Sequence, residues 1–289
     1  MTTTSLWSRL LPGGVLVLLA ALALSAPVYE AAWGIDPNAV ELSQRYGQPS
    51  FTHPLGTDEL GRDLVARLLR GGRVSLSVGL VAALMATAIG TAIGLLAGYF
   101  GGKLDALLMR LTDSVIALPL LPLLIVLAAV DLTKLGVPAA IAQSEDVSLY
   151  RIVVITGLAS WTTVARLVRG ETLALREREF VLAAIGQGAG SFRVMFVHIF
   201  PNALTPIIVA ATLSVGNVIL FESVLSFLGL GIQPPIASWG NMLTHAQETI
   251  WSAPALAIYP GVLILIVVAN CNLLGDRLRD SLDPRSRGR

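Results

Sequence analysis

Six runs of apolar residues, each about as long as a bilayer is thick, constrain what this chain can fold into. A helix rises 1.5 Å per residue, so about 20 apolar residues cross a hydrocarbon core of about 30 Å. The runs cover residues 10–29, 74–97, 114–130, 152–168, 203–228 and 255–274. Only 13% of all residues are charged, against about 25% in a soluble domain. We therefore expect an all-α, polytopic membrane protein with about six transmembrane helices.

The first run has two interpretations. Arg9, the apolar stretch and the small-residue ending at Ala26 resemble a secretory signal, which would be cleaved. The run is long for such a signal, and Pro27 follows the candidate cleavage point. We therefore favour a retained signal-anchor helix.

Several residues inside the runs predict how the helices pack. Gly, Ala, Ser and Thr are frequent in the second run, and small residues let helices approach closely in lipid. Pro119 and Pro122 predict a bend in the third run. Asp113 is expected at the inner boundary, paired with Arg110 or water, and Cys271 is expected to be a small core residue.

The distribution of Lys and Arg predicts the orientation. With the N-terminus in the cytoplasm, 13 of the 20 Lys and Arg fall in cytoplasmic segments, which places both termini inside. The first outer segment holds five Arg and is the exception. Acidic residues are expected to offset them locally, namely Asp36, Glu41, Asp58, Glu59 and Asp63. The net charge of +1 provides no field that would attract nucleic acid.

A polar island, EFVLAAIGQGAGSFRVMFVHIFPN, occupies residues 179–202 between the fourth and fifth runs, which makes it cytoplasmic. The residues at helical spacing are Phe180, Ala183 and Ala184. Three glycines then permit a tight turn, and Ser191 can cap a second helix that runs toward Pro201. We expect a helix, a sharp turn and a helix at the inner membrane face. This hairpin either only caps the bundle or docks a soluble partner.

Two motifs that would supply energy are missing from the sequence. No Gly-rich phosphate loop precedes Lys103 or Lys134, so the chain is not expected to bind ATP by that route. The runs lack the series of buried carboxylates that proton-coupled carriers use. Glu222 is interpreted as a satisfied structural carboxylate, with a pathway-lining group as the alternative. A translocation path formed between two such bundles is plausible.

The polar island resembles the EAA motif of binding-protein-dependent ABC importer permeases. The positions that fit the motif are Ala183, Ala184, Gly188, Ile199 and Pro201. Leu182 replaces the glutamate of the motif, and Glu179 lies three residues earlier, which leaves the polar contact of the motif unassigned. Residues 53–80, 225–243 and 274–285 are similar to segments of dipeptide, oligopeptide and nickel importers, in the C-type permease subunit.

The resemblance implies a type I permease-like bundle with no catalytic residues and no metal site. It divides the chain into a signal-anchor helix and outer segment (1–73), a permease core (74–276) and a cytoplasmic tail (277–289). The coupling loop at about 171–200 would contact an ATPase. The residues that it assigns to this contact are Glu177, Glu179, Phe180, Ala183, Ala184, Gly188 and Pro201. The positions considered for pathway or receptor contact are Glu222, Trp239 and Asp58.

The partners implied are a second homologous permease, two cytoplasmic ATPase subunits that carry ATP and Mg, a periplasmic binding protein and membrane lipid. The chain would then translocate peptides across a bacterial inner membrane, with nickel or another small solute as the alternative cargo. A stand-alone secondary carrier is the competing class of protein. His53, His198 and His245 share no metal-ligand spacing, although His53 and His245 face outside, where a transient nickel contact is conceivable.

The outer and terminal segments have expectations of their own. Leu64, Leu68 and Leu69 predict an amphipathic helix that lies at the outer face. Trp239 and Trp251 in the 229–254 loop are expected to anchor at the membrane interface. The last residues of the tail carry three Arg that would contact anionic lipid or the ATPase, namely Arg285, Arg287 and Arg289.

Overall fold

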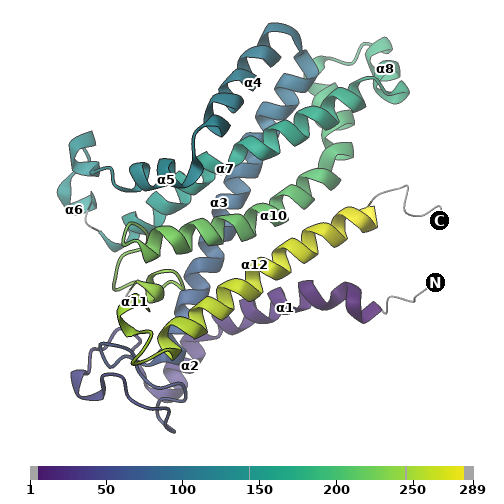
Figure 1. Cartoon of the computed structure of the whole chain (residues 1–289). Coiled ribbons are helices and arrows are strands. Elements are labelled where there is room, and N and C mark those ends of the chain that lie inside the picture. Colours follow the sequence, from purple (N-terminus) through teal and green to yellow (C-terminus); the bar gives the residue numbers. More distant parts are fainter. Residues whose placement is uncertain (1–5, 143, 245, 283–289) are drawn as a thin grey trace.

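The computed structural model describes residues 6–142, 144–244 and 246–282. Its main feature is a bundle of long helices packed side by side (Figure 1). No β-strand occurs among these residues. The longer helices are α1 (Leu6–Leu24), α2 (Ala26–Trp33), α3 (Leu64–Phe100), α4 (Gly102–Ala117), α5 (Leu120–Ala128), α7 (Glu145–Arg176), α8 (Glu179–Gly186), α10 (Phe200–Phe227) and α12 (Ala255–Leu282). The short elements are η1 (Leu42–Gln44), η2 (Leu132–Leu135), α6 (Ala139–Ala142), α9 (Ser191–Arg193), the π-helix η3 (Val194–Ile199), η4 (Asn241–Leu243) and α11 (Ala246–Thr249).

Four helices are long and apolar enough to cross a membrane: α3, α7, the continuous helix Ser191–Phe227 and α12. Two bent pairs bring the number to as many as six. The pair formed by α1 and α2 bends by 42°, and the pair formed by α4 and α5 bends by 85°. The predicted fold class, all-α and polytopic with about six spans, is therefore confirmed.

The sharp bend between α4 and α5 confirms the prediction made from the prolines. Pro119 is the N-cap of α5, and Leu118 before it is extended, with φ −77° and ψ 137°. A residue that precedes proline is disfavoured in the helical region, so α4 ends there. Helix α5 has nine residues and is about 14 Å long, which is too short to cross the bilayer by itself.

Helix α3 begins at Leu64, before the start of the second apolar run at residue 74. Its N-cap Asp63 accepts a hydrogen bond from the Ala66 amide at 2.7 Å, and the helix then runs for 37 residues, about 55 Å. The helix predicted from Leu64 is therefore present, with Leu64 and Leu68 buried, but it continues through Gly71 and Gly72 into the second apolar run, and Arg67 is buried as well. The outer segment and the core expected at 1–73 and 74–276 therefore share this helix.

Helix α3 packs closely against α7 along a stripe of glycines. Gly90, Gly94 and Gly98 recur every fourth residue on one face of α3. A β-carbon built on any of them would lie within 2.7 Å of an atom of α7. This contact confirms that small residues in the second run allow close approach. Cys271 on α12 is buried among apolar side chains, which confirms that it is a core residue.

Two ion pairs tie α4 to α7. Arg169 contacts Asp105 through two hydrogen bonds of 2.5 and 2.6 Å, and Arg166 contacts Asp113 at 2.5 Å. The expectation that Asp113 pairs with Arg110 or water was therefore wrong. The antiparallel packing of α4 on α7 brings Arg166 to Asp113 from 53 residues away in sequence, a contact that no local pattern indicates.

Candidate functional site

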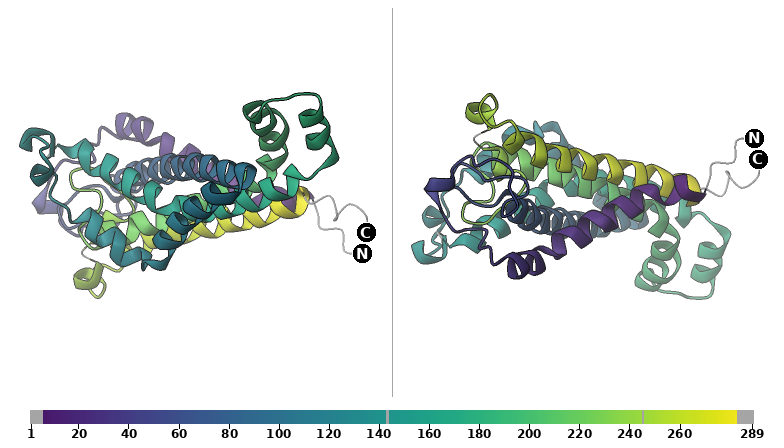
Figure 2. Two further views of the ribbon diagram at one scale, coloured as in Figure 1. Left: turned by 90° about the horizontal axis from the view of Figure 1, so that it is seen from above. Right: turned by 90° about the horizontal axis from the view of Figure 1, so that it is seen from below.

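A short helical hairpin stands out from the bundle at the end where α1 starts and α12 finishes (Figures 1 and 2). Helix α7 ends at Arg176, α8 covers Glu179–Gly186, and a turn through Gly188 leads into α9. The φ of Gly188 is +85°, a backbone conformation that favours glycine. The predicted helix, turn and helix are thus confirmed.

The second helix of the hairpin differs from the prediction in two respects. Gly190 rather than Ser191 is its N-cap, and no side-chain hydrogen bond caps it. The helix also does not stop at Pro201 but continues to Phe227, with the π-helix η3 just before the proline. Because Pro201 lacks an N–H and crowds the preceding turn, the wider π turn lets the helix pass through it.

Helix α8 buries one side chain and exposes several. Val181 is fully buried and packs in the same core cluster as Val194 and Ile199 of η3. Three large apolar side chains point outward instead, with Phe180 43%, Leu182 55% and Ile185 43% exposed. Leu182, which replaces the glutamate of the EAA motif, therefore lies on the exposed surface. An apolar knob of this kind is typical of a surface that a partner covers.

The other residues predicted for this contact lie on the same hairpin or next to it. Glu177 is the C-cap of α7, and Glu179 is the first residue of α8; both are exposed. Ala183 is exposed and Ala184 is half-buried. Pro201 is exposed near the start of α10. The structure therefore brings together all of the positions that the sequence assigned to the coupling loop.

The hairpin is fixed to the helices that cross the membrane. Helix α8 packs against η3, which continues directly into α10. At its other end α8 follows α7, whose Arg176 Nη1 donates to the Tyr99 carbonyl of α3 at 2.9 Å. Packed side chains and a hydrogen bond therefore connect the hairpin to α3, α7 and α10.

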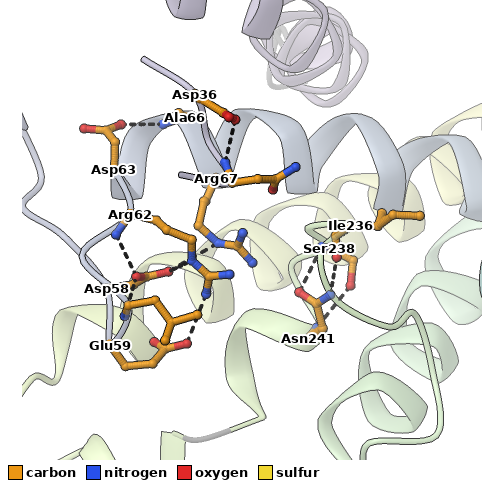
Figure 3. Close-up of polar contacts among 12 residues, drawn as sticks. Asp36, Asp58, Glu59, Arg62, Asp63, Ala66, Arg67, Ile236, Ser238 and Asn241 are labelled. Atoms are coloured by element: carbon orange, nitrogen blue, oxygen red, sulfur yellow. Dashed lines mark hydrogen bonds and ion pairs between the residues drawn. The ribbon is translucent and has the colours of Figure 1, made fainter. Parts of the chain in front are cut away.

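At the opposite end of the bundle, a buried charge cluster orders the loop before α3 (Figure 3). Asp58 accepts hydrogen bonds from the Leu60 and Arg62 amides at 2.9 Å and from Arg62 Nε at 2.7 Å. Arg67 Nε lies 3.4 Å from the same carboxylate, and Arg62 also reaches Glu59 at 3.2 Å. The expected local offset of the Arg charges is therefore confirmed for Asp58 and Glu59, whereas Asp63 pairs with His53 and Arg70 pairs with Glu30 of α2. Asp58 itself is only 4% exposed, so it presents little surface to a partner.

A second network holds the 229–254 loop on α3 and α10. The Glu222 carboxylate is fully buried and accepts hydrogen bonds from Ser75 at 3.1 Å and Ser226 at 2.8 Å. The Trp239 amide donates to Ser75 Oγ at 3.1 Å, and its indole Nε1 donates to the Leu68 carbonyl at 2.9 Å. This arrangement is the satisfied structural carboxylate that the sequence analysis favoured for Glu222.

The two Trp residues of this loop differ in exposure. Trp239 is 2% exposed and packs on Gly71 and Gly72 of α3, so its expected role as an interfacial anchor was wrong. Trp251 is 93% exposed and keeps that role as an expectation. Of the histidines, His53 pairs with Asp63 at 2.9 Å, while His245 lies outside the described residues, as do the three Arg of the tail from Arg285 onward.

A groove of about 590 Å³ runs between α7 and α10. Its α7 wall includes Ser160, Thr163 and Glu171, and its α10 wall includes Thr205 and Asn217. None of these residues was predicted from the sequence, where carboxylates were the polar groups considered inside the apolar runs. The missed signal is the set of neutral polar residues inside the fourth and fifth runs, Ser160 and Thr163 on α7 and Thr205 and Asn217 on α10.

Residues 90–288 match the family described as binding-protein-dependent transport system inner membrane component. The chain is 41% identical to the oligopeptide transport system permease protein OppC of Escherichia coli K12, over 94% of this chain and 85% of that protein. It is 38% identical to the dipeptide transport system permease protein DppC of Alkalihalophilus pseudofirmus, over 91% and 81%.

The fold is similar to that of a solved transporter. A chain of the MetNI methionine ABC transporter, in an inward-facing conformation, superimposes with a TM-score of 0.57 and 20% identity. The match covers 74% of this chain and 95% of that one. At this identity the likeness supports the helical architecture alone.

Proposed function

The chain belongs to the family of binding-protein-dependent transport system inner membrane components, and we propose that it is the C-type permease subunit of an ATP-driven peptide importer. The names of the relatives support peptides as the cargo, since they are oligopeptide and dipeptide permeases. The chain is a transport subunit rather than an enzyme, and ATP and Mg would bind to separate ATPase subunits. The membrane is the bacterial inner membrane, with both termini in the cytoplasm.

Helix α8 is the observation that carries this proposal. Val181 holds the helix on the bundle, while Phe180, Leu182 and Ile185 project away from it. A cleft on an ATPase subunit would cover this apolar surface. A second homologous permease would present an equivalent helix to the other ATPase, and a periplasmic binding protein would deliver peptide at the opposite end of the bundle.

The connections of α8 suggest how ATP hydrolysis would drive transport. Closure of the two ATPases would displace α8, and α8 is packed on η3 at the base of α10. Helix α10 would then tilt against α7, changing the path between the two permeases from inward-open to outward-open. Rigid-body motion of packed helices is a common form of such switching.

Two substitutions in the hairpin test the coupling. Glu179→Arg reverses a charge at the exposed start of α8, and Gly188→Val places a branched side chain at φ +85°. Such strain costs about 1–2 kcal/mol and favours a different turn, so the number of peptides imported per ATP hydrolysed should fall. Gly186→Ala is the matched control, because a β-carbon there meets nothing within 4 Å and φ is not positive.

The measurement uses the complete transporter in proteoliposomes, with membrane insertion checked by fractionation. Unchanged coupling in both variants would contradict the role of α8. Uptake of nickel but not peptide by the wild-type transporter would replace the proposed cargo. Accumulation of substrate by the chain without ATPase subunits would instead support the stand-alone carrier.

A further inference from the structure

The groove between α7 and α10 is long enough to form part of a translocation path across the membrane. Thr205 and Phe221 line its two ends on α10, 16 residues apart, which corresponds to about 24 Å along the helix. This length is most of the thickness of the hydrocarbon core, which is about 30 Å. Besides α7 and α10, Leu120 of α5 and Arg279 of α12 line the groove.

Asn217 stands near the outer part of this groove with its amide unsatisfied. The side chain is exposed on α10, and it makes no hydrogen bond to any described residue. Two other asparagines in the long helices donate to their own helix, Asn202 to the His198 carbonyl and Asn270 to the Ile266 carbonyl, both at 2.7 Å. Asn217 and the exposed Asn272 of α12 make no such hydrogen bond to a described residue, and of these two it is Asn217 that lines the groove, with both its donor and its acceptor available.

The α7 wall carries further polar groups without partners. Ser160 Oγ is buried and has no hydrogen-bond partner among the described residues, and Thr163 is exposed and likewise makes no such bond. Leaving a hydroxyl or amide unsatisfied in an apolar medium costs free energy, and polar groups within membrane spans usually face a cavity or a ligand. The groove is thus lined by neutral hydrogen-bonding groups that have room for an occupant.

Among the described residues that line the groove, the charged side chains lie at the end near α8. These are Glu171, close to the end of α7, and Arg279, close to the end of α12. The longer part of the groove, from Thr205 to Phe221, offers hydroxyls, one amide and apolar surface. A ligand that matches this part presents uncharged donors and acceptors at close spacing, as the amide groups of a peptide main chain do.

We propose that this groove binds the main-chain amide groups of the peptide in transit and that Asn217 is its central contact. The proposal rests on the proposed function as a peptide permease. A side-chain amide can donate to a peptide carbonyl and accept from a peptide N–H at the same time. Because the main chain is common to all peptides and the groove wall is neutral, the transport step does not discriminate between acidic, neutral and basic side chains.

Uptake by the complete transporter tests this with Asn217→Leu, a change of similar size that removes both hydrogen-bonding groups. Loss of one hydrogen bond should lower the uptake rate about threefold to tenfold, equally for tripeptides of net charge −1, 0 and +1. Asn270→Leu is the matched control and should stay close to wild type, since Asn270 bonds its own helix away from the groove. Unchanged uptake in Asn217→Leu, or loss confined to one charge class, would overturn the proposal.

Thiol labelling provides a second readout that does not depend on the transport rate. In a Cys271→Ala background, Asn217→Cys should react with a charged, water-soluble thiosulfonate, and saturating peptide should protect it. Leu220→Cys serves as the control, because Leu220 is 39% exposed on the same helix but does not line the groove. Lack of reaction at position 217, or equal protection at both positions, would count against a peptide-binding groove.

The two proposals fail in different ways. If the wild-type transporter imports no peptide, the proposed function is wrong whatever Asn217→Leu does. If the wild type imports peptide and Asn217→Leu imports all three tripeptides at the same rate, only the assignment of the groove is wrong.

Discussion

The packing of α3 on α7 predicts opposite effects for the same substitution at two glycines. Gly94→Ala should destabilise the protein, whereas Gly170→Ala should stabilise it. A β-carbon on Gly94 would lie 2.7 Å from the Ala165 carbonyl oxygen and from Val168 Cβ, where ordinary contact begins at 3.4 Å. Neither atom can rotate away, so the two helices must separate by about 0.7 Å.

The magnitude follows from two opposing effects at Gly94. Overpacking a tight contact costs about 1–3 kcal/mol. Alanine is favoured over glycine inside a helix by about 0.5–1 kcal/mol. The net loss in the free energy of unfolding is therefore about 0–2.5 kcal/mol, and the midpoints of the two ranges give about 1 kcal/mol. At Gly170 a β-carbon meets nothing within 4 Å, so only the favourable part, about 0.5–1 kcal/mol, remains.

Thermal unfolding in detergent, followed by a thiol-reactive dye, measures both changes. Cys271 is the one cysteine of the chain and is buried, so the dye reacts as the protein unfolds. A change of 1 kcal/mol should move Tm by about 2–4 °C. A Tm for Gly94→Ala at or above the wild-type value would refute the reasoning. A Tm for Gly170→Ala below the wild-type value would show that helix propensity does not govern the stability at that site.

Two further contacts give predictions for the same unfolding assay. Asp105→Asn should lower the free energy of unfolding by about 1 kcal/mol, because it weakens the bidentate ion pair with Arg169. A double variant that exchanges Asp105 and Arg169 should recover part of this loss. No recovery would show that the ion pair itself contributes little to stability. Trp239→Phe should cost about 1 kcal/mol, because it keeps the ring but removes the hydrogen bond to the Leu68 carbonyl; a Tm equal to wild type would argue that water replaces that bond.

The parts of the fold that could be predicted depend on local chemistry. The spans follow from the length of apolar runs, because lipid cannot satisfy a polar backbone and a helix satisfies it internally. The break before Pro119 and the turn at Gly188 follow from what those two residues do to their own backbone. For the same reason α8 could be placed between the two ends of the polar island.

The wrong predictions share a dependence on distant partners. The helix from Leu64 was expected to lie at the outer face, but it buries Arg67, because Asp58 lies beside it in the folded loop. Asp113 was paired with a neighbour on its own helix, whereas Arg166 reaches it from α7. Trp239 was placed at the membrane interface, while the glycine pair of α3 leaves space for it inside.

The order and length of the membrane helices, their main break and the exposed hairpin were determined by the sequence, since each depends on residues within a few turns of one another. The pairing of α7 with α10, and with it the polar groove around Asn217, was decided only by the tertiary structure. The physical reason is that the face of a helix lines a groove only when a second helix packs opposite it. Which helix does so depends on close approach and ion pairing between segments that are far apart in the chain.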